Sequence, residues 1–288
     1  MLASVLPKHA VSNIVYLHNI GSAGSCFTDE NGRELQTTLI AKRGNRDGIY
    51  GVLVPNPYFG TVEKWRSVVD TMAPGTVPRF DKRADTVFWR GSLGEQRSSC
   101  DGDQGNYERF EAASLSINHP KLLDVKFRGV ASEWNTSVSP YEQCEPYDQD
   151  LRDMIGNVVV DHTWYNPYEY ANFKMLLQLP GKTAGSYSRN LNHLWATGSV
   201  ILSWNSTVTE WYYPALVDGV THLNVDYGNV VRKATRVLND AKLADTLRTV
   251  LEKGSQWIYW IILEGVCPDL AQCGSNMRTN HPNPIRSG

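Results

Sequence analysis

The chain has 288 residues, of which 41% are hydrophobic and 20% charged, a composition typical of a folded globular protein and unlike that of a disordered charged tail. Its formal net charge of -2 argues against a general nucleic-acid binder, which usually presents a basic face. No apolar run approaches the roughly 18 residues of a membrane span, and the first residues lack the charged and apolar segments of a signal peptide.

Short apolar runs predict strands, and apolar residues at helical spacing predict helices. In chain order, the first half contains predicted strands at 13–17 and 49–54, a helix at 61–72, a strand at 86–89, a helix at 107–116 and a strand at 121–130.

The second half is more regular. Strands are predicted at 158–160, 176–179, 198–204 and 222–225, with a helix at 190–196 and one long amphipathic helix at 230–254. This alternation predicts a parallel sheet with helices on both faces, and such sheets bind ligands at the carboxyl ends of their strands.

The segment after the strand at 86–89 has a composition suited to anion binding. It contains Arg90, Gly91, Ser92 and Arg97. Glycines let backbone amides approach a phosphate, and arginines form paired hydrogen bonds to its oxygens. An exposed polar loop is the alternative interpretation.

A second such segment precedes the predicted helix at 190–196. It contains Tyr187, Ser188, Arg189 and Asn190, whose amides and hydroxyls favour a phosphate or simply cap the helix. Glu210 follows the strand at 198–204, where its carboxylate is expected to hold ribose hydroxyls or to lie in solvent.

Several other chemistries lack their signatures. The five cysteines include no CxxC pair, and their odd number leaves at least one thiol free unless chains pair. The sequence has no HExxH, GxSxG or GxGxxG motif, which argues against a zinc protease, a serine hydrolase and a dinucleotide-binding enzyme. An unrelated α/β hydrolase that uses His162 or His193 remains a distant alternative.

Seven segments, in order, resemble motifs of glycosyltransferase family 90, which includes the protein O-glucosyltransferases (Rumi), the KDEL-motif-containing proteins and the capsule-associated xylosyltransferases. In this chain the segments are Val54-Pro55 with Trp65, then 88–97, 173–177, 187–202, 210–214, 222–226 and 254–258.

The resemblance implies a GT-B-like α/β fold with two Rossmann-like halves. Residues 1–80 would form a shortened N-terminal, acceptor-side half, residues 81–270 the nucleotide-sugar-binding domain, and residues 271–288 a C-terminal tail.

The resemblance also implies an inverting transfer of glucose or xylose from a UDP-sugar to a hydroxyl of a protein or glycan, without a metal or other cofactor. The donor would contact Arg90, Gly91, Ser92, Arg97, Lys174, Tyr187, Ser188, Arg189, Asn190 and Glu210. Arginines and amides would stabilise the departing UDP.

An inverting transfer needs a base to deprotonate the acceptor. The family places an aspartate just after an N-terminal strand, where this chain has His18 and Asn19. His18, or Asp29 further along, is therefore the expected base. The missing aspartate leaves a catalytically inactive nucleotide-sugar- or glycan-binding relative as the alternative. Relatives work in the endoplasmic reticulum or Golgi lumen, which is the expected location.

Overall fold

The computed structural model describes residues 17–19, 29–33, 38–40, 42–43, 52–53, 67, 70–71, 77–91, 107–128, 161–180, 194–205, 209–210, 213 and 216–248. Among the helices in these ranges, none is both long and apolar enough to cross a membrane.

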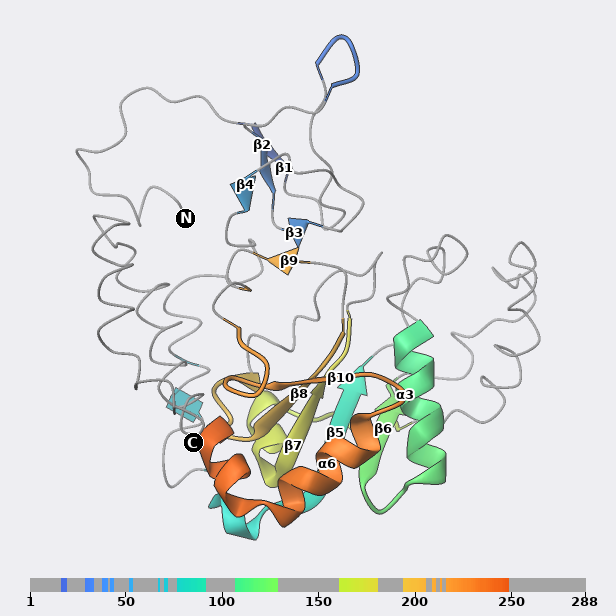
Figure 1. The fold of residues 1–288 in the computed structure, drawn as a ribbon, viewed down its shortest axis with the longest axis vertical. Coiled ribbons are helices and arrows are strands. Elements are labelled where there is room, and N and C mark those ends of the chain that lie inside the picture. The colour runs from blue at the N-terminus through green and yellow to red at the C-terminus, as the bar shows by residue number, and fades with distance from the viewer. Residues whose placement is uncertain are drawn as a thin grey trace, which may run out of the picture.

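A five-stranded parallel sheet dominates the described part of the chain (Figure 1). Its strands are β5 (Ala84–Gly91), β6 (Leu123–Phe127), β7 (Phe173–Gln178), β8 (Val200–Trp204) and β10 (Leu223–Val225). Their spatial order is β10-β8-β7-β5-β6. The order therefore reverses between β5 and β7, because β6 lies on one side of β5 and all later strands lie on the other.

The larger core lies on the face of this sheet that two helices cover. Helices α3 (Tyr107–Asn118) and α6 (Val230–Asn239) contribute small side chains such as Ala113 and Ala234 to this core. Small residues let a helix approach the sheet closely, so the bulky strand residues Trp89 and Trp204 can fill the space between the layers. Both helices lie on one side of the sheet in Figure 1.

The opposite face carries a smaller, aromatic core. Phe88, Leu176 and Ile201 alternate with residues of the larger core along their strands, as the two-residue period of a strand requires. Phe88 stacks on Phe173 with ring centroids 3.9 Å apart. The 3-10 helix η5 (Pro167–Asn172) adds Tyr170 to this layer. A further 3-10 helix, η2 (Phe80–Lys82), precedes β5.

The N-terminal residues form a separate parallel sheet in the order β1-β2-β4, with β1 (Leu17–Asn19), β2 (Thr38–Ile40) and β4 (Val52–Leu53). A two-stranded antiparallel ribbon of β3 (Lys42–Arg43) and β9 (Thr209–Glu210) links residues from the two regions of sequence. Figure 1 shows the small sheet beyond one end of the large one, with the ribbon between them.

Most predicted elements within the described ranges are confirmed, with shifted ends. The strand predicted at 13–17 is described only from Leu17 onward, as β1. The predicted strand at 158–160 lies outside the described residues, as do most of the predicted helices at 61–72 and 190–196.

The single long helix predicted at 230–254 is wrong. Helix α6 ends at Asn239, and a second helix spans 241–248. Asp240 separates them with φ -121° and ψ 86°, outside the helical region. Its carboxylate accepts a hydrogen bond from the Leu243 amide at 2.9 Å, so it caps the second helix.

The chain thus has the parallel α/β fold that the sequence predicted, with a large C-terminal sheet and a small N-terminal one. The GT-B-like arrangement stays an expectation from the family resemblance. The domain limits at residues 80 and 270 remain a prediction. Pairing between β3 and β9 shows that contacts cross the first of these limits.

Candidate functional site

The carboxyl edge of the large sheet is where a ligand is expected. In open parallel sheets, ligands bind outside the carboxyl ends of the strands, where the strand order reverses. That reversal lies between β5, which ends at Gly91, and β7, which ends at Gln178. Ser92 follows β5 directly in the sequence, and Gly181 follows the last described residue after β7, Pro180.

A cavity of about 370 Å³ opens at this edge, beside the ends of β7, β8 and β10. Its volume lies within the range of small-molecule sites, about 300–1,000 Å³. The lining residues are Gln178, Pro180, Ser203, Trp204, Asn205, Tyr213, Leu216, His222 and Asn224.

Three of these residues form a polar row across neighbouring strands. Gln178 on β7 is in register with Ser203 on β8, and Ser203 is in register with Asn224 on β10. Residues in register on parallel strands point to the same face. The row therefore presents two amides and a hydroxyl to the cavity, none of which carries a charge.

Gln178 has an unused hydrogen-bonding atom. Its side chain is only 5% exposed, and its Nε2 donates to the Leu179 carbonyl at 3.1 Å. Its Oε1 is buried and has no hydrogen-bond partner among the described residues. Leaving a buried acceptor unpaired costs about 1–3 kcal/mol, so this oxygen favours any bound molecule or small side-chain shift that supplies a donor.

His222 forms another uncharged part of the wall. Its Nε2 lies 2.7 Å from Asn224 Oδ1 and its Nδ1 lies 2.9 Å from Thr221 Oγ1. Burial lowers the pKa of His222, against the opposing effect of the Asn224 hydrogen bond and the Asp218 charge. The imidazole is therefore neutral at pH 7, and the cavity wall suits a ligand held by neutral hydrogen bonds.

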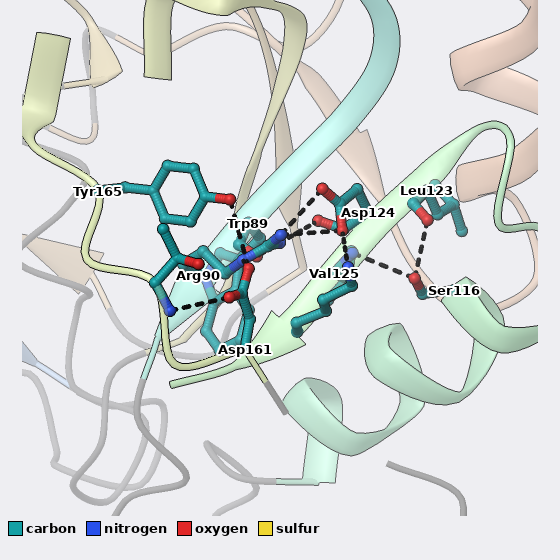
Figure 2. Close-up of polar contacts among 10 residues, drawn as sticks. Trp89, Arg90, Ser116, Leu123, Asp124, Val125, Asp161 and Tyr165 are labelled. Atoms are coloured by element: carbon teal, nitrogen blue, oxygen red, sulfur yellow. Dashed lines mark hydrogen bonds and ion pairs between the residues drawn. The ribbon is translucent and has the colours of Figure 1, made fainter. Parts of the chain in front are cut away.

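Arg90 lies beside this edge but is occupied by protein groups (Figure 2). Its side chain is 3% exposed. Its Nε donates to Asp161 at 2.8 Å, its Nη2 donates to both Asp124 oxygens, and its Nη1 donates to the carbonyls of Trp89 and Asp124. This arrangement differs from the direct donor contact expected for Arg90, because the guanidinium joins β5, β6 and the segment at Asp161.

Asp161 is held as an anion by this network. Partial burial acts to raise its pKa, but hydrogen bonds from Thr163 and Arg90 and the charge of Arg90 lower the pKa well below its usual range. The Thr163 amide lies 2.9 Å from Asp161 Oδ1, and Figure 2 shows the Tyr165 hydroxyl directed at the same carboxylate. The network therefore joins the carboxyl end of β5 to Asp124, near the start of β6, and to the segment at Asp161.

Gly91 has a packing role at the end of β5. A Cβ atom there would lie 2.3 Å from Cζ2 of the Trp89 ring, closer than real contacts allow. Only glycine lets the chain pass this indole and continue to Ser92. Gly91 is thus at the expected edge of the sheet, for a steric reason that applies with or without a ligand.

Lys174 lies at the wrong end of its strand for the expected donor contact. It is the second residue of β7, whereas the cavity is at the carboxyl end of that strand. Its Nζ pairs with Asp85, near the start of β5. This position differs from the expected one, because ligands of parallel sheets bind at the opposite edge, and the donor contact of Lys174 stays a prediction.

The expected base residues lie in the N-terminal region. His18 is the central residue of β1 and is in register with Leu39 of β2. Asp29 Oδ1 accepts hydrogen bonds from the amides of Asn31 and Arg33 at 2.8 and 2.9 Å. This carboxylate therefore stabilises its own turn, a use that differs from the expected catalytic one.

The remaining predicted site residues are not brought into the described site. Glu210 has its backbone in β9, in register with Lys42. Ser92, Arg97, Tyr187, Ser188, Arg189 and Asn190 lie outside the described residues. Within the described ranges, no group of three or more histidine, cysteine, aspartate or glutamate side chains is arranged to hold a metal ion. The metal-free reaction stays a prediction.

Sequence reasoning missed the polar row. A usable signal was present, because Gln178 and Ser203 are polar residues near the carboxyl ends of their strands and each follows three apolar residues. Their alignment with Asn224 depends on strand register, which the sequence does not display.

No protein-family model matches the chain, and no curated protein matches it. Its structure is similar to that of the pneumococcal O-GlcNAc transferase GtfA in complex with UDP and GlcNAc, with a TM-score of 0.39 and 10% identity over 70% of this chain and 37% of GtfA. The C-terminal CMP-Kdo binding domain of WaaA from Acinetobacter baumannii gives a TM-score of 0.34 and 12% identity over 67% of this chain and 96% of that domain. TarM gives a TM-score of 0.36 and 11% identity over 86% of this chain and 51% of TarM.

The chain therefore spans about a third of GtfA and about half of TarM. Likenesses this distant assign no function to this chain.

Proposed function

We propose that this protein is a nucleotide-sugar-dependent glycosyltransferase. The observation that carries the proposal is the uncharged cavity at the carboxyl edge of the large sheet, with the unpartnered Gln178 oxygen at its wall. A nucleoside or a sugar is a neutral ligand rich in hydrogen-bond donors and acceptors. The amides of Gln178 and Asn224, the Ser203 hydroxyl and the neutral His222 match that chemistry.

The charged part of the donor requires different groups. The predicted phosphate-binding residues Ser92 and Arg97 come directly after β5, and Tyr187 to Asn190 come after β7 in the sequence. Both segments thus follow the two strands between which the strand order reverses. This chain order supports a division in which the cavity holds the neutral portion of the donor and these segments hold the diphosphate.

The finer proposal follows the family resemblance. The donor is UDP-glucose or UDP-xylose, and the transfer inverts the anomeric centre onto a hydroxyl of a protein or glycan. No metal or cofactor takes part, because Arg97, Arg189 and backbone amides neutralise the leaving UDP. The endoplasmic reticulum or Golgi lumen is the proposed location.

His18 is the proposed base, because one carboxylate oxygen of Asp29 already accepts hydrogen bonds from the Asn31 and Arg33 amides of its own turn. The same observation favours a second candidate function, that of an inactive relative that binds nucleotide-sugars or glycans. The sequence has no Asp or Glu between Asn19, the last residue of β1, and Asp29, so this protein could bind a nucleotide-sugar without transferring the sugar.

Calorimetric titration with UDP, UDP-glucose, UDP-xylose and CMP, paired with an assay of UDP release, tests both functions. We expect binding of UDP and one UDP-sugar, with release of UDP that His18→Ala abolishes. Binding without any release identifies the inactive relative. Absence of binding to every nucleotide contradicts the whole proposal.

A matched pair of variants on β7 tests the site itself. Gln178→Leu removes the amide from the cavity and is expected to weaken nucleotide binding by about tenfold, the effect of losing one hydrogen bond of about 1.4 kcal/mol. Lys174→Met alters the opposite end of the same strand and is expected to leave binding unchanged. Equal effects of the two variants would place the ligand elsewhere.

A further inference from the structure

Two aromatic side chains outside the cavity are unusually exposed. Trp164 is 60% exposed and Tyr168 is 45% exposed, on the segment between Asp161 and β7. Single exposed aromatic residues are common on protein surfaces. These two are connected through specific contacts, which isolated surface residues lack.

One amide ties the two rings together. Trp164 Nε1 donates to Asn166 Oδ1 at 3.4 Å, and Asn166 Nδ2 donates to the Tyr168 hydroxyl at 3.3 Å. The Arg128 guanidinium carbon lies 3.4 Å from the centroid of the Trp164 ring. We name Arg128, Trp164, Asn166 and Tyr168 the aromatic platform.

The backbone beneath the platform is anchored at several points. The Asp161 amide donates to the Phe127 carbonyl at 2.8 Å, and the Asp161 carboxylate binds Arg90 and the Thr163 amide. At the other end, the Asn166 amide donates to Glu169 at 2.6 Å, within a capping box that begins η5. A surface held in place before binding loses less entropy when a ligand arrives.

The chemistry of the platform fits a sugar ring. A pyranose has flat patches of C–H groups that pack on aromatic faces, and a rim of hydroxyls that needs hydrogen-bonding partners. Trp164 and Tyr168 supply exposed aromatic surface, and Asn166 supplies a polar group at the edges of both rings. Arg128 lies over one face of the Trp164 ring, which is still 60% exposed.

A protein partner fits less well. A stable protein interface covers about 800 Å² on each partner. The other large hydrophobic side chains exposed in the described part of the chain are Ile117, Val217, Val220 and Tyr227. Ile117 lies in the last turn of α3, and the other three flank β10, at the opposite edge of the sheet from β6.

The platform also lies at the functional edge of the sheet. Arg128 follows β6, and its amide donates to the carbonyl of Gly91, the last residue of β5, at 2.8 Å. A glycan on the platform would therefore lie close to the point where the predicted phosphate-binding residues begin.

We propose that the aromatic platform binds a pyranose ring of a glycan, and that this glycan is the acceptor of the transfer. Its role as acceptor rests on the proposed transferase function, whereas binding of carbohydrate does not.

Titration of the full chain with xylo-, cello-, malto- and manno-oligosaccharides, without nucleotide, tests the platform. Tryptophan fluorescence and calorimetry both report binding. We expect one oligosaccharide class to bind, and Trp164→Ala to weaken that binding by about tenfold or more, as loss of a central aromatic contact does. Trp164→Phe keeps an aromatic face and should retain most of the affinity.

Tyr227→Ala is the matched control, because Tyr227 is 51% exposed and follows β10, at the opposite edge of the sheet. It should leave oligosaccharide binding unchanged. If Trp164→Ala has a lowered melting temperature, Tyr168→Ala provides a second test of the same surface.

The proposal that the aromatic platform binds glycans would be overturned if none of the four oligosaccharide classes bound. It would also be overturned if the wild type, Trp164→Ala and Tyr168→Ala bound oligosaccharide equally well. Capture of a protein through Trp164 with no oligosaccharide affinity would overturn it as well. Oligosaccharide binding without any nucleotide binding would support glycan binding by the aromatic platform and would reject the proposed transferase function.

Discussion

Glu108 is a buried acid whose charge state should affect the stability of the fold. It lies in the first turn of α3, and its Oε2 is buried without a hydrogen-bond partner among the described residues. Burial, with a smaller contribution from Glu111, raises the pKa of Glu108 from 4.5 to about 7, against the opposing effects of a hydrogen bond from its own backbone amide and of the Arg109 charge. The folded protein therefore binds a proton that the unfolded chain releases between these pH values.

Because the folded-state pKa is raised, stability is greatest below pH 4.5 as far as this group is concerned, and it falls as pH rises to about 7. The loss is up to about 3 kcal/mol, at 1.36 kcal/mol per pKa unit. We expect Glu108→Gln to flatten this dependence, measured by urea unfolding at pH 5 and pH 8. An unchanged dependence in the variant would show that Glu108 is not the group responsible.

Gly91 offers a steric prediction at the same scale. Gly91→Ala brings a Cβ into the Trp89 ring, so the indole must move within the larger core. Overpacking of this kind costs about 1–3 kcal/mol. Gly228→Ala is the control, because its Cβ would meet only Asp226 Oδ1, at 3.5 Å. Thermal unfolding should show a lowered melting temperature for the first variant and little change for the second.

At the scale of elements, Arg90 is the connection between β5, β6 and the segment that leads to η5. Removing one partner of a buried ion pair leaves a charge uncompensated and costs about 3–5 kcal/mol, whereas exposed pairs contribute about 0–1 kcal/mol. We therefore expect Asp161→Ala to be strongly destabilising and Asp81→Ala, which breaks the exposed pair with Arg79, to be nearly neutral. Denaturant unfolding gives the free energy of unfolding of both variants. Similar decreases in this free energy would mean that Arg90 finds other partners when Asp161 is removed.

The junction between α6 and the following helix depends on Asp240. Its carboxylate caps the second helix through the Leu243 amide. Asp240→Ala should cost about 1 kcal/mol, and Asp240→Asn, which keeps a capping oxygen, only a small part of that. Free energies of unfolding in urea measure both. Equal losses would indicate that the charge, and not the cap, is what stabilises the junction.

This junction also shows why the sequence predicted the wrong helix. Val230, Ala234, Val237, Ala244 and Leu247 all pack into one core, so their spacing reads as a single amphipathic face. Two helices separated by one extended residue preserve nearly the same pattern. The break depends on a local hydrogen bond that apolar periodicity does not report.

For the whole molecule, the five strands and their parallel direction were predictable, because apolar runs indicate strands and alternating helices indicate parallel connections. Their spatial order was not predicted, because it depends on pairing between strands distant in sequence. The site was predictable only as an edge of the sheet. Arg90 pairs with Asp124 and Asp161, which are distant from it in the sequence. The residues next to Arg90 in the sequence do not indicate that these two carboxylates neutralise its charge. The row of Gln178, Ser203 and Asn224 likewise depends on strand register.

The ribbon of β3 and β9 has a consequence for synthesis of the chain. Lys42 pairs with Glu210 and Arg43 with Thr209, so β3 leaves the ribosome long before its partner has been made. Contacts between residues this far apart form late, and unpaired strand edges are prone to association with other chains. The pairing that connects the two regions therefore forms only after Thr209 and Glu210 have been synthesised, long after β3.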